Sequence, residues 1–339
     1  MKTVVSVQEI AELEIKPSSE VAEWRRLVAA EIAIRWGDRS GWISVPCPAC
    51  GSAAAHPAFE RLGIAYAECA ECGTLYAPRR PDEPALRAWY RESAPVRFWR
   101  ERLLPASAMA RQEKIVRPRA DWVLDGIAEY VPQARRLVDL SPHGRPLLDA
   151  IAEGASALTE LVAAGVTADL DGVAAERVQV RPANVVDLPA LGPADVVVAV
   201  DVIERAADPH VLVSALSRLM AVGGVVFATF PVASGFEVQA LWERSPTVLP
   251  PDKLTLPTVD GLMRMFPAPA WEVLELSTPG MFDVETVRRS IAADPMGPWP
   301  RVVRALVERT DTMGRDTFVE FLQARRLTSF ARLVARRSR

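Results

Sequence analysis

The sequence predicts an α/β protein whose main domain is a mostly parallel, doubly wound sheet, preceded by a helical segment and a small cysteine-rich ribbon. From Arg136 onward, short apolar runs alternate with amphipathic helical patterns, which favours parallel strands with helices on both faces. The four cysteines lie together upstream of that alternation, between Cys47 and Cys72. With 339 residues, the chain is long enough for two domains.

Residues 1 to about 45 are predicted to be helical. Apolar residues recur there at three- and four-residue spacing until Gly37 and Gly41, which favour the end of a helix. The apolar positions are Val21, Trp24, Leu27, Val28, Ile32 and Ile34.

The four cysteines form two pairs, Cys47 with Cys50 and Cys69 with Cys72, separated by 18 residues. This is the spacing of a four-thiolate zinc site. A glycine follows each pair and suits the tight turn that wraps a metal. Because four thiolates complete the tetrahedron and leave no position for water or substrate, we expect the zinc to be structural. Two disulfides are the alternative, which a reducing compartment disfavours.

A proline-dense run from Ala77 to Pro84 predicts a boundary, because proline continues neither a helix nor a central strand. Helices are expected over 85–131, with an aromatic stripe typical of a core or a domain interface. The stripe consists of Trp89, Tyr90, Phe98, Trp99 and Trp122. The predicted segments are an N-terminal helix and zinc ribbon (1–84), a helical connector (85–131), the sheet domain (132–290) and a C-terminal helical extension (291–339).

The sheet domain is predicted to begin with a short strand at Leu137–Leu140. A helix should follow and end at Gly165, with one apolar face formed by Leu148, Ile151, Ala155, Leu158 and Val162. The further strands are expected at 166–171, 178–181, 194–201 and 225–231, with a helix over about 209–220 before the last. Residues 324–339 hold six arginines, no acid and interleaved apolar residues, and are expected to form a solvated helix.

The composition excludes several classes of function. Lys and Arg number 40 against 43 Asp and Glu, so the formal net charge is −3 and no overall positive field favours nucleic acid or an anionic membrane. The longest uncharged apolar stretch, 221–236, is too short to span a bilayer and contains glycine and proline. The first ten residues do not read as a secretory signal, so a cytoplasmic location is expected.

The order of elements resembles that of the bacterial zinc-ribbon class I S-adenosylmethionine (SAM) methyltransferases, which include sugar C-methyltransferases and enzymes of natural-product pathways. The resemblance covers nearly the whole chain. It rests on the segments 72–81, 111–119, 201–209, 230–236 and 274–280, and on Gly223-Gly224 before the fifth strand. It implies a Rossmann-like domain with a seven-stranded sheet, one antiparallel edge strand, and a SAM site above the first, second and fourth strands.

The loop after the first strand departs from the family pattern. Members carry Asp-x-Gly-x-Gly-x-Gly, whose glycines let the backbone pass close to the methionine part of SAM. Asp139 matches the acid, but Ser141, His143 and Arg145 occupy the glycine positions, and Gly144 lies off register. The cofactor-binding set implied by the resemblance is Asp139, Ser141, His143, Gly144, Asp171, Asn184, Asp187 and Asp201. The Asp171 carboxylate would accept hydrogen bonds from the ribose hydroxyls. If the register of the second strand is shifted, Asp169 would take this role.

The acceptor side departs as well. The family commonly has Glu-His after the fourth strand and a second His after Pro-Pro-Asp, whereas this chain has Glu204-Arg205 and Lys253. A guanidinium does not serve as a base. Glu204, Arg205 and Lys253 are therefore the catalytic candidates, with Glu204 or Lys253 taking the proton. The segment 234–256 matches the substrate-facing lid of the family.

Two hypotheses remain open. One is methyl transfer to a sugar, nucleotide-sugar or natural-product intermediate; a cleft lined by Arg205, Lys253 and Arg145 would suit an anionic small molecule. The other is a protein of this fold that no longer transfers methyl groups and instead holds a partner enzyme or runs another reaction.

Overall fold

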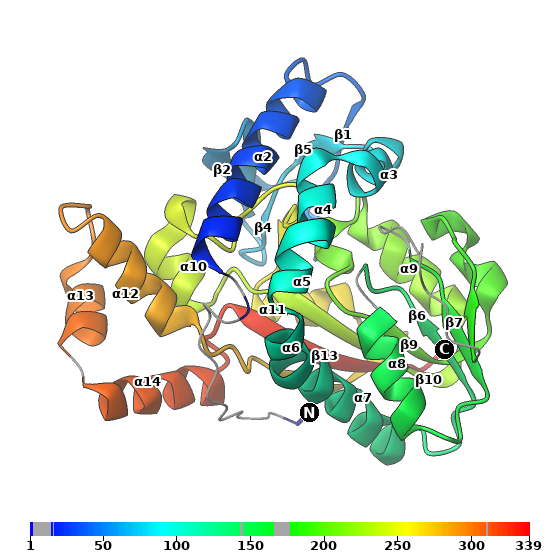
Figure 1. The fold of residues 1–339 in the computed structure, drawn as a ribbon. Helices are drawn as coiled ribbons and strands as arrows, with labels where there is room; N and C mark the ends of the chain where they lie inside the picture. The colour runs from blue at the N-terminus through cyan, green and yellow to red at the C-terminus, as the bar shows by residue number, and fades with distance from the viewer. Residues whose placement is uncertain (3–14, 16, 143–144, 166–176, 310) are drawn as a thin grey trace.

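The central sheet has seven strands in the order β12-β13-β10-β9-β6-β7-β8 (Figure 1). A computed structural model of the chain describes residues 1–2, 15, 17–142, 145–165, 177–309 and 311–339. The strands are β6 (Arg136–Asp139), β7 (Glu160–Ala163), β8 (Val178–Val180), β9 (Ala194–Ala199), β10 (Met220–Pro231), β12 (Trp271–Ser277) and β13 (Phe330–Arg337). The pairs from β8 to β10 are parallel, whereas β13 is antiparallel to both neighbours. The prediction of a mostly parallel α/β sheet is confirmed.

The C-terminal residues correct two expectations. Residues 330–337 form a strand, not the solvated helix predicted for them, and this strand lies between β10 and β12 rather than at an edge. Apolar residues at three- and four-residue spacing favoured a helix, but Ala331 and the consecutive residues 333–335 are completely buried within the sheet. Pairing on both sides outweighs the local helical pattern.

Helices cover both faces of the sheet. One face carries α7 (Arg117–Tyr130) and α8 (Arg145–Gly154), and the other carries the 3-10 helix η3 (Val185–Leu191), α9 (Pro209–Leu219) and α11 (Val259–Met265). Successive residues of β9 point to opposite faces, so that Val196 and Val198 pack toward α7 and α8 while Val197 packs toward α9.

The second strand lies earlier than the sequence predicted. We expected the helix after β6 to continue to Gly165, but α8 ends at Gly154 and Val162 belongs to β7. The amide of Ala155 still bonds to the carbonyl of Ile151, and a short turn then leads into the strand. Leu158 and Val162 have helical spacing in the sequence but are buried on opposite sides of the sheet, Leu158 in a turn beside α8 and Val162 on β7 toward α9. The predicted strand at 166–171 lies outside the described residues.

The N-terminal half joins the sheet domain through shared structure. Helix α2 (Ser18–Trp36) precedes β1 (Trp42–Ser44) and a ribbon made of β2 (Ala55–Arg61), β3 (Ile64–Cys69) and β4 (Leu75–Tyr76). The fourth strand of this ribbon sheet is β11 (Thr255–Leu256), from the far side of the sheet domain, and β1 pairs with β5 (Arg79–Pro81). The connector follows as α3 (Glu83–Glu92), α4 (Ala94–Phe98), η1 (Trp99–Leu103), α5 (Leu104–Ala106), α6 (Ala108–Arg111) and η2 (Gln112–Val116).

The aromatic stripe of the connector packs in the interior. Trp89 is almost completely buried and stacks on Trp36 of α2 with ring centroids 5.0 Å apart. Trp122 packs edge-on against Phe227 of β10 at 5.3 Å. These rings hold the connector against α2 and the central sheet.

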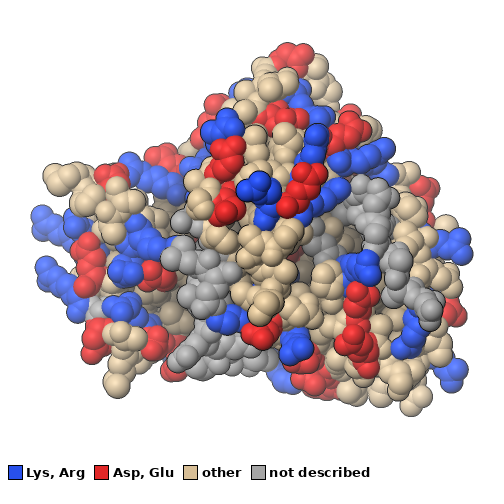
Figure 2. Space-filling model, viewed as in Figure 1, with Lys and Arg blue, Asp and Glu red and all other residues tan. Residues whose placement is uncertain are grey.

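The remaining helices lie around the lid and between β12 and β13. They are α10 (Phe236–Leu241), the 3-10 helix η5 (Trp242–Arg244), α12 (Asp283–Ala293), α13 (Arg301–Glu308) and α14 (Thr312–Ala324). Among the described helices, none combines the length and apolar character needed to cross a membrane. Cations and acids are interspersed over the face shown in Figure 2, in keeping with the small net charge.

Candidate functional site

The four cysteines converge as their spacing predicts. Their sulfur atoms all lie within 4.8 Å of one another, with Cys47 to Cys72 at 3.6 Å and Cys50 to Cys69 at 3.5 Å. Four sulfurs around a tetrahedral zinc with bonds of 2.3 Å would lie about 3.8 Å apart. The four thiols are free, and each pair is closed by a glycine with positive φ whose amide bonds to the first cysteine's carbonyl. The cluster fits one tetrahedral metal ion with no open position.

The cysteine cluster packs against the sheet domain. The imidazole of His210 at the start of α9 contacts the carbonyl of Cys47 at 2.9 Å, and the Thr258 hydroxyl donates to the carbonyl of Cys72 at 2.6 Å. Cys47, Cys69 and Cys72 share a core with residues of β6 and β9. Loss of a metal ion bound by these cysteines would therefore disturb the adjoining residues of the sheet domain.

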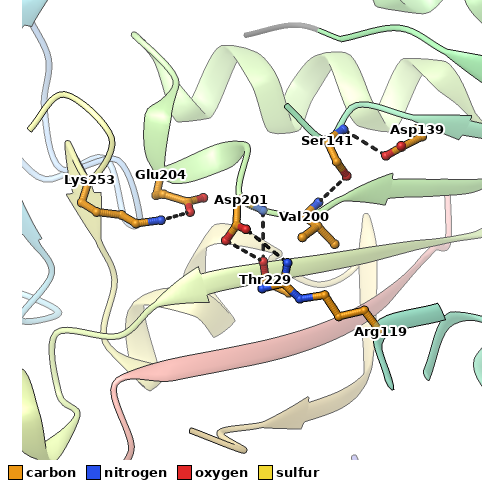
Figure 3. Close-up of polar contacts among 8 residues, drawn as sticks. All are labelled: Arg119, Asp139, Ser141, Val200, Asp201, Glu204, Thr229 and Lys253. Atoms are coloured by element: carbon orange, nitrogen blue, oxygen red, sulfur yellow. Dashed lines mark hydrogen bonds and ion pairs between the residues drawn. The ribbon is translucent and has the colours of Figure 1, made fainter. Parts of the chain in front are cut away.

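The loop after β6 is closed by its own polar groups (Figure 3). The buried carboxylate of Asp139 accepts a hydrogen bond from the amide of Ser141 at 2.9 Å, and the Ser141 hydroxyl accepts one from the amide of Val200 at 3.2 Å. Burial raises the pKa of Asp139 from 3.8 to about 6, against the hydrogen bonds from Ser141, which lower it. The side chain at the first glycine position thus bonds to the end of β9.

Of the other two substituted glycine positions, Arg145 is described by the structure and His143 is not. Arg145 begins α8 and pairs with Asp149 one turn later, at 3.4 Å. His143 and Gly144 lie outside the described residues, and so do Asp169 and Asp171. Strand β7 ends at Ala163 and is followed by Ala164 and Gly165, so no carboxylate stands directly after it.

The two residues expected near an adenine lie at the start of η3. The Asn184 amide donates to the Asp187 carboxylate at 2.8 Å. The amide of Val185, between them, bonds to Glu83 of α3 at 3.3 Å. The structure therefore brings this loop to the connector.

Asp201, directly after β9, has a strained backbone and an ion pair. Its φ is +56°, a conformation that residues other than glycine seldom adopt. Its amide donates to the Thr229 hydroxyl of β10 at 3.0 Å, and its carboxylate lies 3.3 Å from the guanidinium of Arg119 on α7 (Figure 3). Sequence reasoning missed Arg119 and Thr229 as site residues. Arg119 lies at the end of a segment that carries the family resemblance, which was the available signal.

Glu204 and Lys253 form a pair at the carboxyl end of the sheet. The Lys253 ammonium donates to Oε1 of Glu204 at 2.6 Å (Figure 3). The Glu204 side chain is completely buried, and its second oxygen, Oε2, has no hydrogen-bond partner in the described structure, whereas the Lys253 side chain is 20% exposed. Burial raises the pKa of Glu204, while the Lys253 ammonium lowers it. Two predicted catalytic residues are thus in direct contact, with Lys253 on the accessible side.

Arg205 lies in a separate ion pair. Its guanidinium is 3.7 Å from the Asp252 carboxylate and lies over the ring of Tyr90 at 5.6 Å from the centroid. Arg205 also lines a cavity of about 190 Å³ between β1, α3, η3 and α9, together with Ile43, Glu83, Leu86, Val185 and Val211. Asp252 and Tyr90 were not predicted as site residues, because their proximity to Arg205 arises only from the fold.

The basic cleft stays a prediction, and the structure places an acid beside each of its three cations. Arg205, Lys253 and Arg145 each have a carboxylate partner, namely Asp252, Glu204 and Asp149. Each of these three positive charges therefore has a negative charge beside it.

The sheet has seven strands, mostly parallel, with one antiparallel strand, as the family resemblance implies, except that this strand lies inside the sheet and not at its edge. The fold is that of the class I methyltransferases. No protein-family model matches the sequence, and no curated protein matches it either.

Solved structures with a similar fold include several SAM-dependent methyltransferases. A geranyl diphosphate methyltransferase in complex with SAM is 14% identical, with 68% of this chain and 89% of that chain covered and a TM-score of 0.43. A putative sarcosine dimethylglycine methyltransferase from Galdieria sulphuraria is 13% identical, with 70% and 88% covered and a TM-score of 0.41. The [4+2]-cyclase SpnF is 16% identical, with 64% and 80% covered and a TM-score of 0.40. The fold assignment rests on the chain's own strand order.

Proposed function

We propose that this protein is a SAM-dependent methyltransferase that acts on a sugar, a nucleotide-sugar or a natural-product intermediate, and that the four cysteines hold a structural zinc ion. The observation that carries the proposal is the Glu204–Lys253 pair at the carboxyl end of β9, where ligands of doubly wound sheets bind. A buried acid with an unpaired oxygen, bonded to a partly accessible ammonium, is suited to proton transfer.

We propose that the described residues hold an adenosyl ligand. The side chain of Ser141 is turned toward β9, and Arg145 pairs along α8, so backbone groups and the carboxylates of Asp139 and Asp201 remain at the strand ends. Asn184 and Asp187 would lie toward the adenine. When bound, SAM supplies an electrophilic methyl group on a sulfonium ion, and nearby carboxylates favour this positive charge.

The chain's own residues would manage the acceptor proton. Lys253 transfers one ammonium proton to Glu204 and then accepts a proton from the acceptor hydroxyl or carbon. The raised pKa of Glu204 makes the first of these transfers less costly. Orientation of the acceptor then accounts for most of the rate, because an in-line displacement depends on alignment.

The first test is calorimetric titration of the metal-loaded protein with SAM and with its demethylated product. Micromolar binding of either ligand supports the proposal, and Lys253→Met should leave that binding intact while it abolishes methyl transfer. Glu204→Gln should lower the transfer rate by about 10²-fold or more, the usual range for a lost acid–base group. Transfer at the unaltered rate in both variants would remove the pair from the mechanism.

A protein that does not transfer methyl groups is the second candidate. Ser141 favours this candidate, because it replaces a glycine of the family pattern and its hydroxyl accepts a hydrogen bond from the amide of Val200. No binding by the native protein, together with binding by a Ser141→Gly, His143→Gly, Arg145→Gly variant, would establish it. The fold would then serve a partner enzyme or another reaction.

A further inference from the structure

Lys253 belongs to a segment that the ribbon holds from outside. The hydroxyl of Tyr66, on β3, donates to the carbonyl of Lys253 at 2.7 Å. The next carbonyl, that of Leu254, accepts from the amide of Ala77 at 2.9 Å, and β11 then pairs with β4. On the other side, the amide of Leu254 donates to the carbonyl of Glu204 at 3.0 Å.

Arg80, on β5, hydrogen-bonds to the same segment. Its guanidinium is completely buried and donates to the carbonyl of Leu254 at 3.0 Å and to the hydroxyl of Thr255 at 3.1 Å. It also reaches the carbonyl of Ala206, in the loop of Glu204, at 3.3 Å. The backbones that carry the two members of the candidate pair are therefore connected through the side chain of Arg80 on β5.

Tyr66 is suited to holding a neighbouring backbone at a fixed distance. It is 2% exposed and stacks on Phe59 with centroids 5.5 Å apart, so its ring has little freedom. Burial raises the pKa of its phenol, so the hydroxyl stays protonated and remains a donor. Three residues later the same strand ends at Cys69, one of the four clustered thiols. The position of Tyr66 therefore depends on the order of the metal site.

We propose that Tyr66 is a positioning residue that sets Lys253 against Glu204, so that the ribbon forms part of the candidate active site. A lysine side chain has four rotatable methylene groups, and its ammonium meets Glu204 at 2.6 Å only if its backbone is fixed. The catalytic consequence rests on the proposed methyl transfer. The positioning of Lys253 does not, and it can be measured separately.

The chain is suited to that measurement because it has only four lysines, at positions 2, 16, 114 and 253. Brief acetylation followed by mass spectrometry gives the rate at each one. In Tyr66→Phe, the acetylation rate of Lys253 should rise severalfold, the factor expected for one lost hydrogen bond, while Lys2 and Lys114 remain unchanged. Tyr76→Phe is the matched control, because Tyr76 is also a 2% exposed ribbon tyrosine, and no hydrogen bond of its hydroxyl is found in the described structure.

Removal of the metal from the native protein should have the same effect on Lys253, with Lys2 as the internal reference. Equal acetylation of Lys253 in the native protein, Tyr66→Phe and the metal-free protein would overturn the proposal. Where methyl transfer is measurable, Tyr66→Phe should lower kcat and leave the KM for SAM unchanged. Faster acetylation without any methyl transfer would uphold the positioning of Lys253 and refute the proposed function instead.

Discussion

The cysteine cluster and the loop after β6 both bring several polar groups together, yet only the first follows from the sequence alone. The cluster is assembled from two tight turns within 26 residues, 47–72, and each turn fixes its own geometry. The loop after β6 depends on β9, because Ser141 bonds to Val200, 59 positions away. Local spacing therefore decides a ribbon site, whereas a site at strand ends is decided by which strands become neighbours.

The largest expected effect distinguishes the two regions directly. Cys72→Ser should release the metal and unfold the ribbon, because binding energies of about 10 kcal/mol or more are coupled to folding at structural zinc sites. Metal content and thermal melting would measure this, with Ser52→Ala as the control in the same ribbon. Retention of one metal ion per chain by Cys72→Ser would show that the fourth thiol is dispensable.

The next effect concerns the Glu204–Lys253 pair. Lys253→Met leaves a buried carboxylate without its cation and should destabilise the protein by about 4 kcal/mol. Glu204 already has a raised pKa, so its charging opposes folding and the loss in the variant should grow as pH rises. Urea unfolding at acidic and neutral pH measures this. The double variant with Glu204→Gln should recover much of the loss, and no recovery would mean that the charge pair is not the cause.

Asp139 supplies a pH dependence from the loop after β6. Its pKa is raised from 3.8 to about 6 by burial, so its protonated form favours the folded state. The stabilisation from Asp139 is complete below pH 3.8, the pKa of the unfolded state. It is lost as the pH rises through about 6, the pKa of the folded state, and the total loss in free energy of unfolding is about 3 kcal/mol. Asp139→Asn should lack this part of the pH profile. An identical profile in denaturant titrations of both proteins would contradict the buried state of the carboxyl.

The smallest effect is expected at the partly exposed pair of Asp201 and Arg119. A double-mutant cycle of Asp201→Asn and Arg119→Met should give a coupling energy of about 1 kcal/mol or less, because solvent screens both groups. High salt should reduce it further. A coupling several times larger would indicate that the pair is shielded in solution.

The order of the helices and strands was largely readable from the sequence, and its exceptions share a cause. β6, β9 and β10 have apolar runs typical of buried strands, so β6 and β9 were predicted close to their observed limits and β10 at its C-terminal end, although β10 begins at Met220 and not at Val225. β7 and β13 are short or arginine-rich, and their strand character depends on their neighbours. The cluster of cysteines was predicted completely.

For the candidate site, the sequence predicted individual residues within motifs but not the contacts between distant segments. Glu204 and Lys253 were both named from motifs, but their contact at 2.6 Å joins residues 49 positions apart. Asp252, Tyr90 and Thr229 have no sequence signal of their own, because their roles come from packing against Arg205 and Asp201. The sequence therefore indicated three cations without showing that each has its own acid.

The bond from Tyr66 to Lys253 spans 187 positions, which has a consequence for chain growth. At 5 to 20 residues per second, a ribosome takes roughly 10 to 40 s to add that length of chain. Throughout that interval the nascent ribbon has its cysteines but lacks its fourth strand, and one edge of β4 is unpaired. Early metal capture would shorten the exposure of that edge, so the supply of metal during synthesis bears on the yield of native protein.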